Sequence, residues 1–147
     1  MTVVTRDDAD LQELAERGAA ELGPDATAEE LLRWADENFG GLGHGSGYIV
    51  ASNMQDAVLV DLAAKVRPGV DILFLDTGYH FVETIGTRDA VEAVYDVNVV
   101  NVRPERTVAE QDAEYGKDLF AREPDRCCAL RKVVPLERTL SGYDAWV

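Results

Sequence analysis

Apolar residues along the chain form two patterns, short continuous runs and longer stripes of helical period. Continuous runs of strand length occupy residues 48–51, 70–75 and 97–102. Stripes bounded by capping residues, Gly or Pro predict helices over residues 8–22, 27–39, 54–67, 80–95, 107–115 and 125–138. Continuously apolar strands separated by helices are typical of a parallel sheet covered on both faces. We therefore predict an α/β fold, a parallel sheet flanked by helices.

The two helices that precede the first strand predict an N-terminal helical layer. Residues 1–40 would form this layer, and residues 41–147 would form an α/β domain, with one domain overall. A glycine-rich run over residues 40–47 separates the two parts. Because it precedes a strand and does not follow one, we interpret it as a connector and His44 as a solvated loop residue, not as a phosphate-binding loop.

The chain is strongly acidic, with a net charge of −14. This charge argues against binding to nucleic acid or to an anionic membrane. No apolar run is long enough to span a membrane and no basic, apolar leader opens the chain, so we expect a cytoplasmic protein. Residues 103–138 carry eight basic and eight acidic side chains, and the basic ones either hold an anionic small molecule or form ion pairs along a helical face.

Polar residues follow two of the predicted strands. Ser52-Asn-Met-Gln-Asp56 follows the first strand, and Leu75-Asp-Thr-Gly78 ends the second. In an open parallel sheet a ligand binds beyond the carboxyl ends of the strands, where helix N-termini attract anions. The simpler alternatives are an ordinary helix cap at Ser52 and a common turn at Asp76.

The two cysteines, Cys127 and Cys128, are adjacent on a predicted helix. Neighbouring helical residues diverge by roughly 100°, so this pair cannot easily chelate a single metal ion or close an unstrained disulfide. The two thiols can bind two different irons of one cubic cluster. Arg131 and Lys132 each follow a cysteine by four residues, which favours thiolates and offers positive charge to a substrate. The alternative is two small buried side chains.

Four segments together resemble a known family. They are Ser52–Asp56, Leu75–His80, Val108–Asp112 and Cys127–Leu136, in this order and spacing. From about Thr27 to Val147 the chain resembles the assimilatory adenylyl-sulfate reductases of the phosphoadenylyl-sulfate reductase family, most of all the actinobacterial type. The resemblance implies an adenine nucleotide alpha hydrolase-like fold, which is Rossmann-like with a PP-loop.

The resemblance also implies a reaction and roles for particular residues. The family's enzymes reduce adenosine 5′-phosphosulfate to sulfite and AMP with electrons from thioredoxin, in sulfate assimilation and cysteine biosynthesis. Ser52 would contact the phosphosulfate, while Leu75, through its backbone, and Thr77 would hold the adenosine. Lys132 would act electrostatically between sulfate and cluster. Cys127 and Cys128 would be two of the four ligands of a [4Fe-4S] cluster, and His80 either lies near the nucleotide or is structural.

Two motifs of the resembling family are missing, a second cysteine pair and a C-terminal tail with the nucleophilic cysteine. We therefore expect the N-terminal two-thirds of a reductase, with an α/β domain incomplete at its C-terminus. The chain alone would be inactive, and exposed apolar surface would favour a homo-oligomer.

Three other functions stay open. They are a non-catalytic adenine-nucleotide-binding module that binds AMP, a phosphoadenylyl-sulfate reductase, and an ATP-using relative. The glycine-free loop after Ser52 argues against the last, because paired glycines there let a backbone approach a pyrophosphate.

Overall fold

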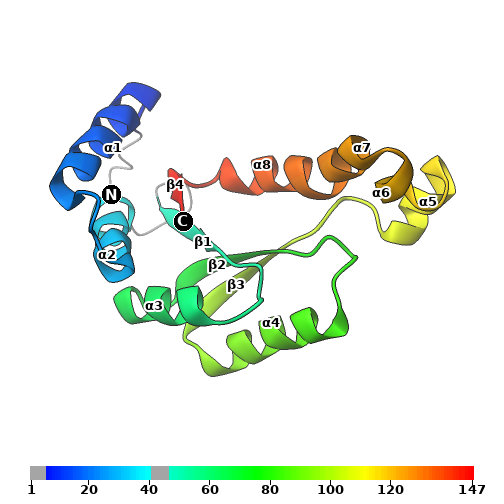
Figure 1. Ribbon diagram of the computed structural model, residues 1–147, viewed down its shortest axis with the longest axis horizontal. Coiled ribbons are helices and arrows are strands. Elements are labelled where there is room, and N and C mark those ends of the chain that lie inside the picture. The colour runs from blue at the N-terminus through cyan, green and yellow to red at the C-terminus, as the bar shows by residue number, and fades with distance from the viewer. Residues whose placement is uncertain (1–5, 41–46) are drawn as a thin grey trace.

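A four-stranded parallel sheet forms the centre of the computed structural model, which describes residues 6–40 and 47–147. The strand order is β3-β2-β1-β4, and every neighbouring pair is parallel (Figure 1). The strands are β1 (Tyr48–Ala51), β2 (Val70–Leu75), β3 (Val97–Val102) and β4 (Ala145–Trp146). The three predicted strands and the parallel α/β fold are confirmed, and β4 is an addition that the sequence did not reveal.

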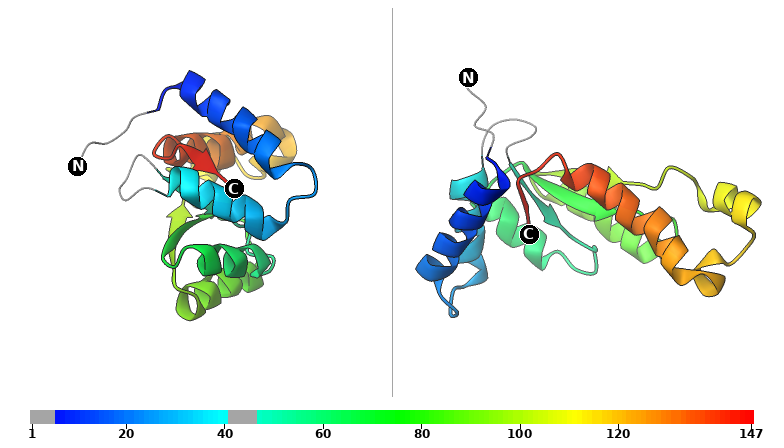
Figure 2. Two further views of the ribbon diagram at one scale, coloured as in Figure 1. Left: turned by 90° about the vertical axis from the view of Figure 1, so that its left-hand side faces the viewer. Right: turned by 90° about the horizontal axis from the view of Figure 1, so that it is seen from above.

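Helices cover both faces of this sheet and extend beyond both of its ends. They are α1 (Asp8–Leu22), α2 (Ala28–Phe39), α3 (Val58–Val66), α4 (Val82–Val94), α5 (Val108–Tyr115), α6 (Leu119–Arg122), α7 (Pro124–Cys128) and α8 (Val134–Leu140), with a π-helix, η1 (Ala129–Val133), joining the last two. Helices α3 and α4 lie on one side of the sheet and α8 on the other (Figure 1). Helices α5, α6 and α7 lie beyond the carboxyl ends of the strands, opposite to α1 and α2 (Figure 2).

Alternation along the strands divides the core into two layers. Val50, Ile72 and Phe74 are fully buried on the face covered by α2, α3 and α4, in a cluster that also includes Leu14 and Leu32 of the N-terminal helices. On the other face, Ile49, Leu73 and Val102 pack against Leu136 and Leu140 of α8. Burying each such side chain stabilises the fold by about 1.5–3 kcal/mol. Among the described residues, no helix is both long and apolar enough to cross a membrane.

Helix α3 begins four residues later than the sequence pattern predicts. The predicted start at Met54 is wrong because this residue has a φ of 56°, in the left-handed region that helices of L-residues exclude. Three side chains instead form turns with the backbone two residues on. The N–H groups of Met54, Gln55 and Val58 donate to side-chain oxygens of Ser52 (3.2 Å), Asn53 (3.1 Å) and Asp56 (2.9 Å). Ser52 therefore belongs to a compact loop and does not cap the helix.

The predicted helix over 125–138 is observed over 124–140, with a π segment in its middle. The Val134 N–H donates to the carbonyl of Ala129, five residues earlier. Pro135 explains this widening, because it has no N–H to offer to the carbonyl of Arg131 four residues before it. Each cysteine and the cation four residues after it therefore do not have the relative position that the predicted regular α-helix would give them.

Tyr48 makes the stability of the fold sensitive to alkaline pH. Its hydroxyl donates to Asp36 Oδ1 at 3.1 Å, and burial, followed by the charge of Asp36, raises its pKa from 10.0 to about 12. Because the pKa is raised, the stability that the protonated Tyr48 hydroxyl contributes is complete below pH 10 and is lost as the pH rises towards 12.

We expect the free energy of unfolding of the wild type to fall between pH 10 and pH 12 by about 2 kcal/mol more than that of Tyr48→Phe, as measured by urea denaturation. Tyr143 serves as an internal control. Burial and its hydrogen bond to Asp71 also raise its pKa, but it is present in both proteins, so its contribution cancels. Parallel pH profiles for the two proteins would contradict the expectation.

Candidate functional site

The loop after β1 is held closed by its own side chains. The Ser52 N–H donates to the carbonyl of Leu73 on β2 at 3.0 Å, which ties the loop to the carboxyl end of the neighbouring strand. The Met54 side chain is buried, only 1% exposed, and its backbone adopts the left-handed conformation that usually needs glycine. A strained, over-determined loop at a strand end is a common feature of binding sites.

The loop after β2 is a tight turn stabilised by Asp76. Its Oδ1 accepts from the Gly78 N–H at 3.1 Å, and its Oδ2 lies 3.4 Å from Arg103 Nε at the end of β3. His80 Nε2 lies 2.8 Å from the carbonyl oxygen of Leu75, so this nitrogen carries the proton. The imidazole also stacks on Phe74 at 5.0 Å. His80 therefore donates a hydrogen bond to the Leu75 carbonyl and supports the loop.

A cavity of about 350 Å³ lies between this loop and the helix that carries the cysteines. Thr77 lines it from the β2 side, and Cys127, Cys128 and Lys132 line it from the helical side. Ser52 and Leu75 are not among its lining residues. The structure thus brings four of the six predicted site residues to one cavity, although they are up to 55 residues apart in the chain.

Arg131 fastens the two walls of this cavity together. Its guanidinium is only 3% exposed and donates to the carbonyls of Thr77 (2.5 Å) and Arg106 (3.1 Å) and to Gln111 Oε1 (3.1 Å). From the sequence we expected Arg131 to act on Cys127 or on a substrate. Its role in linking the two walls of the cavity was not predicted. One signal was present, because Gln111 and Arg131 both lie in segments that carry the family resemblance.

The cysteines match half of the donor set that a cubic cluster needs. Cys127 is buried, Cys128 is exposed, neither forms a disulfide, and both face the same cavity. A [4Fe-4S] cluster requires four thiolates, one to each iron, so the pair can hold two of its irons. In residues 6–40 and 47–147 there is no group of three or more His, Cys, Asp or Glu arranged to hold a metal.

Comparison with known proteins decides the family. The model of the phosphoadenosine phosphosulfate reductase domain matches residues 47–147. This chain belongs to that family. The match covers every strand of the sheet and the helix with the cysteines, and the resemblance seen in the sequence is confirmed.

Curated relatives in this family are named adenosine 5′-phosphosulfate reductase. The protein of Mycolicibacterium smegmatis is 74% identical over 145 residues, which are 99% of this chain and 59% of the relative. That of Mycobacteroides abscessus is 73% identical over 143 residues, 97% of this chain and 58% of the relative. The chain therefore spans a little under three-fifths of the length of the relatives that it matches.

A solved structure supports the fold of this phosphoadenosine phosphosulfate reductase domain. The crystal structure of phosphoadenylyl-sulfate reductase from Candida auris, a phosphate complex, superposes with a TM-score of 0.68 at 24% identity. The alignment covers 99% of this chain and 68% of that protein. The glycine-rich connector and His44 largely fall within residues 41–46, which lie outside the described residues.

Proposed function

We propose that this chain supplies the nucleotide-binding part of an adenylyl-sulfate reductase, which converts adenosine 5′-phosphosulfate to sulfite and AMP. The cavity that joins Thr77, Lys132 and the two cysteines carries the proposal. The names of the actinobacterial relatives support the substrate. The alternatives are a phosphoadenylyl-sulfate reductase, with a substrate that has a further 3′-phosphate, and a module that only binds an adenine nucleotide.

The residues of the cavity suit a sulfated nucleotide. The Lys132 ammonium would neutralise charge on the sulfate, and Thr77 would hold the adenosine end together with Leu75, which would act through its backbone from outside the cavity. Ser52 would contact the phosphosulfate from its loop, although it does not line the same cavity. The loop after Ser52 has no paired glycines of the kind that let a backbone approach a pyrophosphate, which favours a substrate without one.

Cys127 and Cys128 would hold two irons of a [4Fe-4S] cluster, and the remaining two ligands would come from outside these 147 residues. When bound, the cluster would contribute a fixed charge distribution beside the sulfate. Reduction of sulfate to sulfite needs two electrons, for which we propose a thioredoxin dithiol. A reducing cytoplasm suits the two free thiols. Self-association remains a prediction.

Two measurements test the proposal. Calorimetric titration with adenosine 5′-phosphosulfate, AMP and ATP compares the ligands directly. We expect binding of the first two and weaker binding of ATP. The second measurement joins residues 1–147 to the remainder of the Mycolicibacterium smegmatis relative and assays thioredoxin-dependent sulfite release. Nucleotide binding without activity in this chimaera would favour the binding module.

Lys132→Ala is expected to weaken the affinity for adenosine 5′-phosphosulfate by about tenfold, because one charge-assisted contact to the sulfate is lost. Lys65→Ala is a matched control. Lys65 is an exposed helical lysine paired with Asp61 four residues earlier, so its removal should leave the affinity unchanged. Equal affinities for the two variants would contradict the role given to Lys132.

A further inference from the structure

Arg131 is a buried positive charge whose hydrogen-bond partners are all neutral. Its guanidinium donates to two backbone carbonyls and one amide oxygen, and no carboxylate in residues 6–40 or 47–147 lies within 4.0 Å of it. A buried charge without a counter-charge keeps a desolvation cost that a bound anion would reduce. Arg131 therefore marks a place where an anion would be stabilised.

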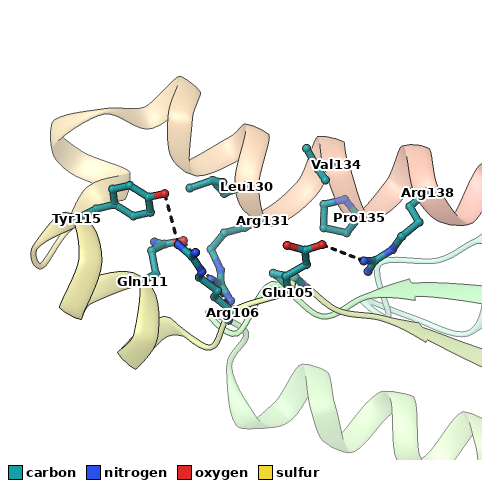
Figure 3. A pocket seen from close by; sticks show the side chains of 10 residues that line it. Glu105, Arg106, Gln111, Tyr115, Leu130, Arg131, Val134, Pro135 and Arg138 are labelled. Atoms are coloured by element: carbon teal, nitrogen blue, oxygen red, sulfur yellow. Dashed lines mark hydrogen bonds and ion pairs between the residues drawn. The ribbon is translucent and has the colours of Figure 1, made fainter.

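A second cavity, of about 160 Å³, also has Arg131 in its lining (Figure 3). Gln111 and Tyr115 of α5 line it, together with Glu105 and Arg106 of the preceding loop and Arg138 of α8. Cys127, Cys128, Thr77 and Lys132 line the first cavity, which is proposed to hold the nucleotide and is called the nucleotide cavity below. Arg131 is the one residue that lines both cavities. The volume of the second cavity is several times the roughly 30 Å³ of one liquid water, which leaves room for a tetrahedral anion.

Gln111 lines this cavity and has a buried amide nitrogen without a hydrogen-bond partner. Its side chain is buried, 1% exposed, and its Oε1 accepts from Arg131 Nη1 at 3.1 Å. Because a guanidinium only donates, this contact fixes which end of the amide faces Arg131. The Nε2 group is then left with no hydrogen-bond partner. A buried amide nitrogen of this kind needs an acceptor.

The other charged side chains that line the cavity are paired. Arg106 forms an ion pair with Glu114, and Arg138 Nη1 lies 3.6 Å from Glu105 Oε1 (Figure 3). Glu105 is therefore engaged by Arg138, and the guanidinium of Arg131 is the charge left to neutralise. We propose that this second cavity binds a small tetrahedral oxyanion, such as sulfate or phosphate, at Gln111 and Arg131.

Nuclear magnetic resonance can observe this site directly on the intact chain. The sequence has three glutamines and four asparagines, so the side-chain NH₂ signals are few, and the pair that disappears in Gln111→Glu belongs to Gln111. Titration with sodium sulfate, and separately with phosphate, at an ionic strength held constant with chloride, should shift the Gln111 pair saturably. The pairs of Gln12 and Gln55 should not follow. A Gln111 signal that does not move, or that moves in proportion to the other two, would overturn the proposal.

A variant provides a second test that does not depend on assignment. Gln111→Glu places a carboxylate next to Arg131 and supplies the counter-charge itself. The rise in Tm that sulfate produces in the wild type should then be lost, while Gln55→Glu, on an exposed loop residue, should keep it. Equal sulfate responses in the two variants would contradict the site.

Saturating AMP distinguishes this site from the nucleotide cavity. If the two cavities are separate, the Gln111 signals should still shift with sulfate when AMP is bound. Loss of the sulfate shift under AMP would show that the anion occupies the phosphate position of the nucleotide, and would overturn the assignment of a separate site.

Discussion

Replacing Arg131 with methionine is expected to lower the free energy of unfolding by about 4 kcal/mol. The guanidinium supplies donors to Thr77, Arg106 and Gln111, which belong to three different segments, and methionine leaves all three acceptors unpaired. A loss of this size is a large part of the stability of an ordinary domain. Urea denaturation measures the loss in the free energy of unfolding. The nucleotide affinity should also fall, because both walls of the cavity depend on Arg131.

Arg33→Met provides the matched control for this experiment. Arg33 is an exposed arginine on α2 that pairs with Glu29 four residues earlier at 2.6 Å. Exposed pairs of this kind contribute little to stability. If Arg131→Met lowered the free energy of unfolding no more than Arg33→Met, the hydrogen bonds of Arg131 would not be what links the strand-end loop to the helix.

The second large effect is expected at Gly78. Its φ of 81° is unfavourable for alanine, and an added Cβ would lie 3.0 Å from Arg131 Nη2 and 3.0 Å from Val108 Cγ2. Gly78→Ala should therefore cost about 2–3 kcal/mol, from backbone strain together with the displacement of Arg131. The free energy of unfolding from urea denaturation is the quantity to compare.

Two other glycines separate the causes of this loss. Gly69 has a similar φ of 79°, but a Cβ added there would meet no atom within 4 Å, so Gly69→Ala should show the backbone strain alone. Gly86 lies inside α4 with open space around it, and Gly86→Ala should stabilise the protein by up to about 1 kcal/mol. Equal losses at Gly78 and Gly69 would mean that the contact with Arg131 contributes nothing.

The sequence predicted those parts of the fold that depend on local pattern. Strands β1, β2 and β3 have the predicted bounds, because β1 and β2 are apolar runs buried on both faces and the valines of β3 are at least partly buried. Helix α2 begins at the capping box of Thr27 and Glu30 that its sequence predicts, and α1 begins at a further capping box, of Asp7 and Asp10, that was not predicted. Features set by tertiary contacts were not predictable. The two-residue strand β4 has no pattern of its own and forms only by pairing with β1.

Backbone conformation limited the prediction of the site. The left-handed Met54 delays the start of α3, and no sequence rule expects a non-glycine residue there. Pro135 could have indicated an irregular helix, but not its π form. The sequence grouped Thr77, Lys132 and the cysteines by resemblance. Only the structure shows that Arg131 holds Thr77 against their helix and that Ser52 lies outside their cavity.

The most direct test of the nucleotide site uses the exposed thiol of Cys128 as a reporter. Thr77, Lys132 and both cysteines line one cavity, so a sulfated nucleotide bound there should shield this thiol. We predict that adenosine 5′-phosphosulfate slows the alkylation of Cys128 by iodoacetamide, followed by mass spectrometry, and that adenosine, which lacks the phosphosulfate, slows it much less. An unchanged alkylation rate when the nucleotide is bound at saturation would contradict the account.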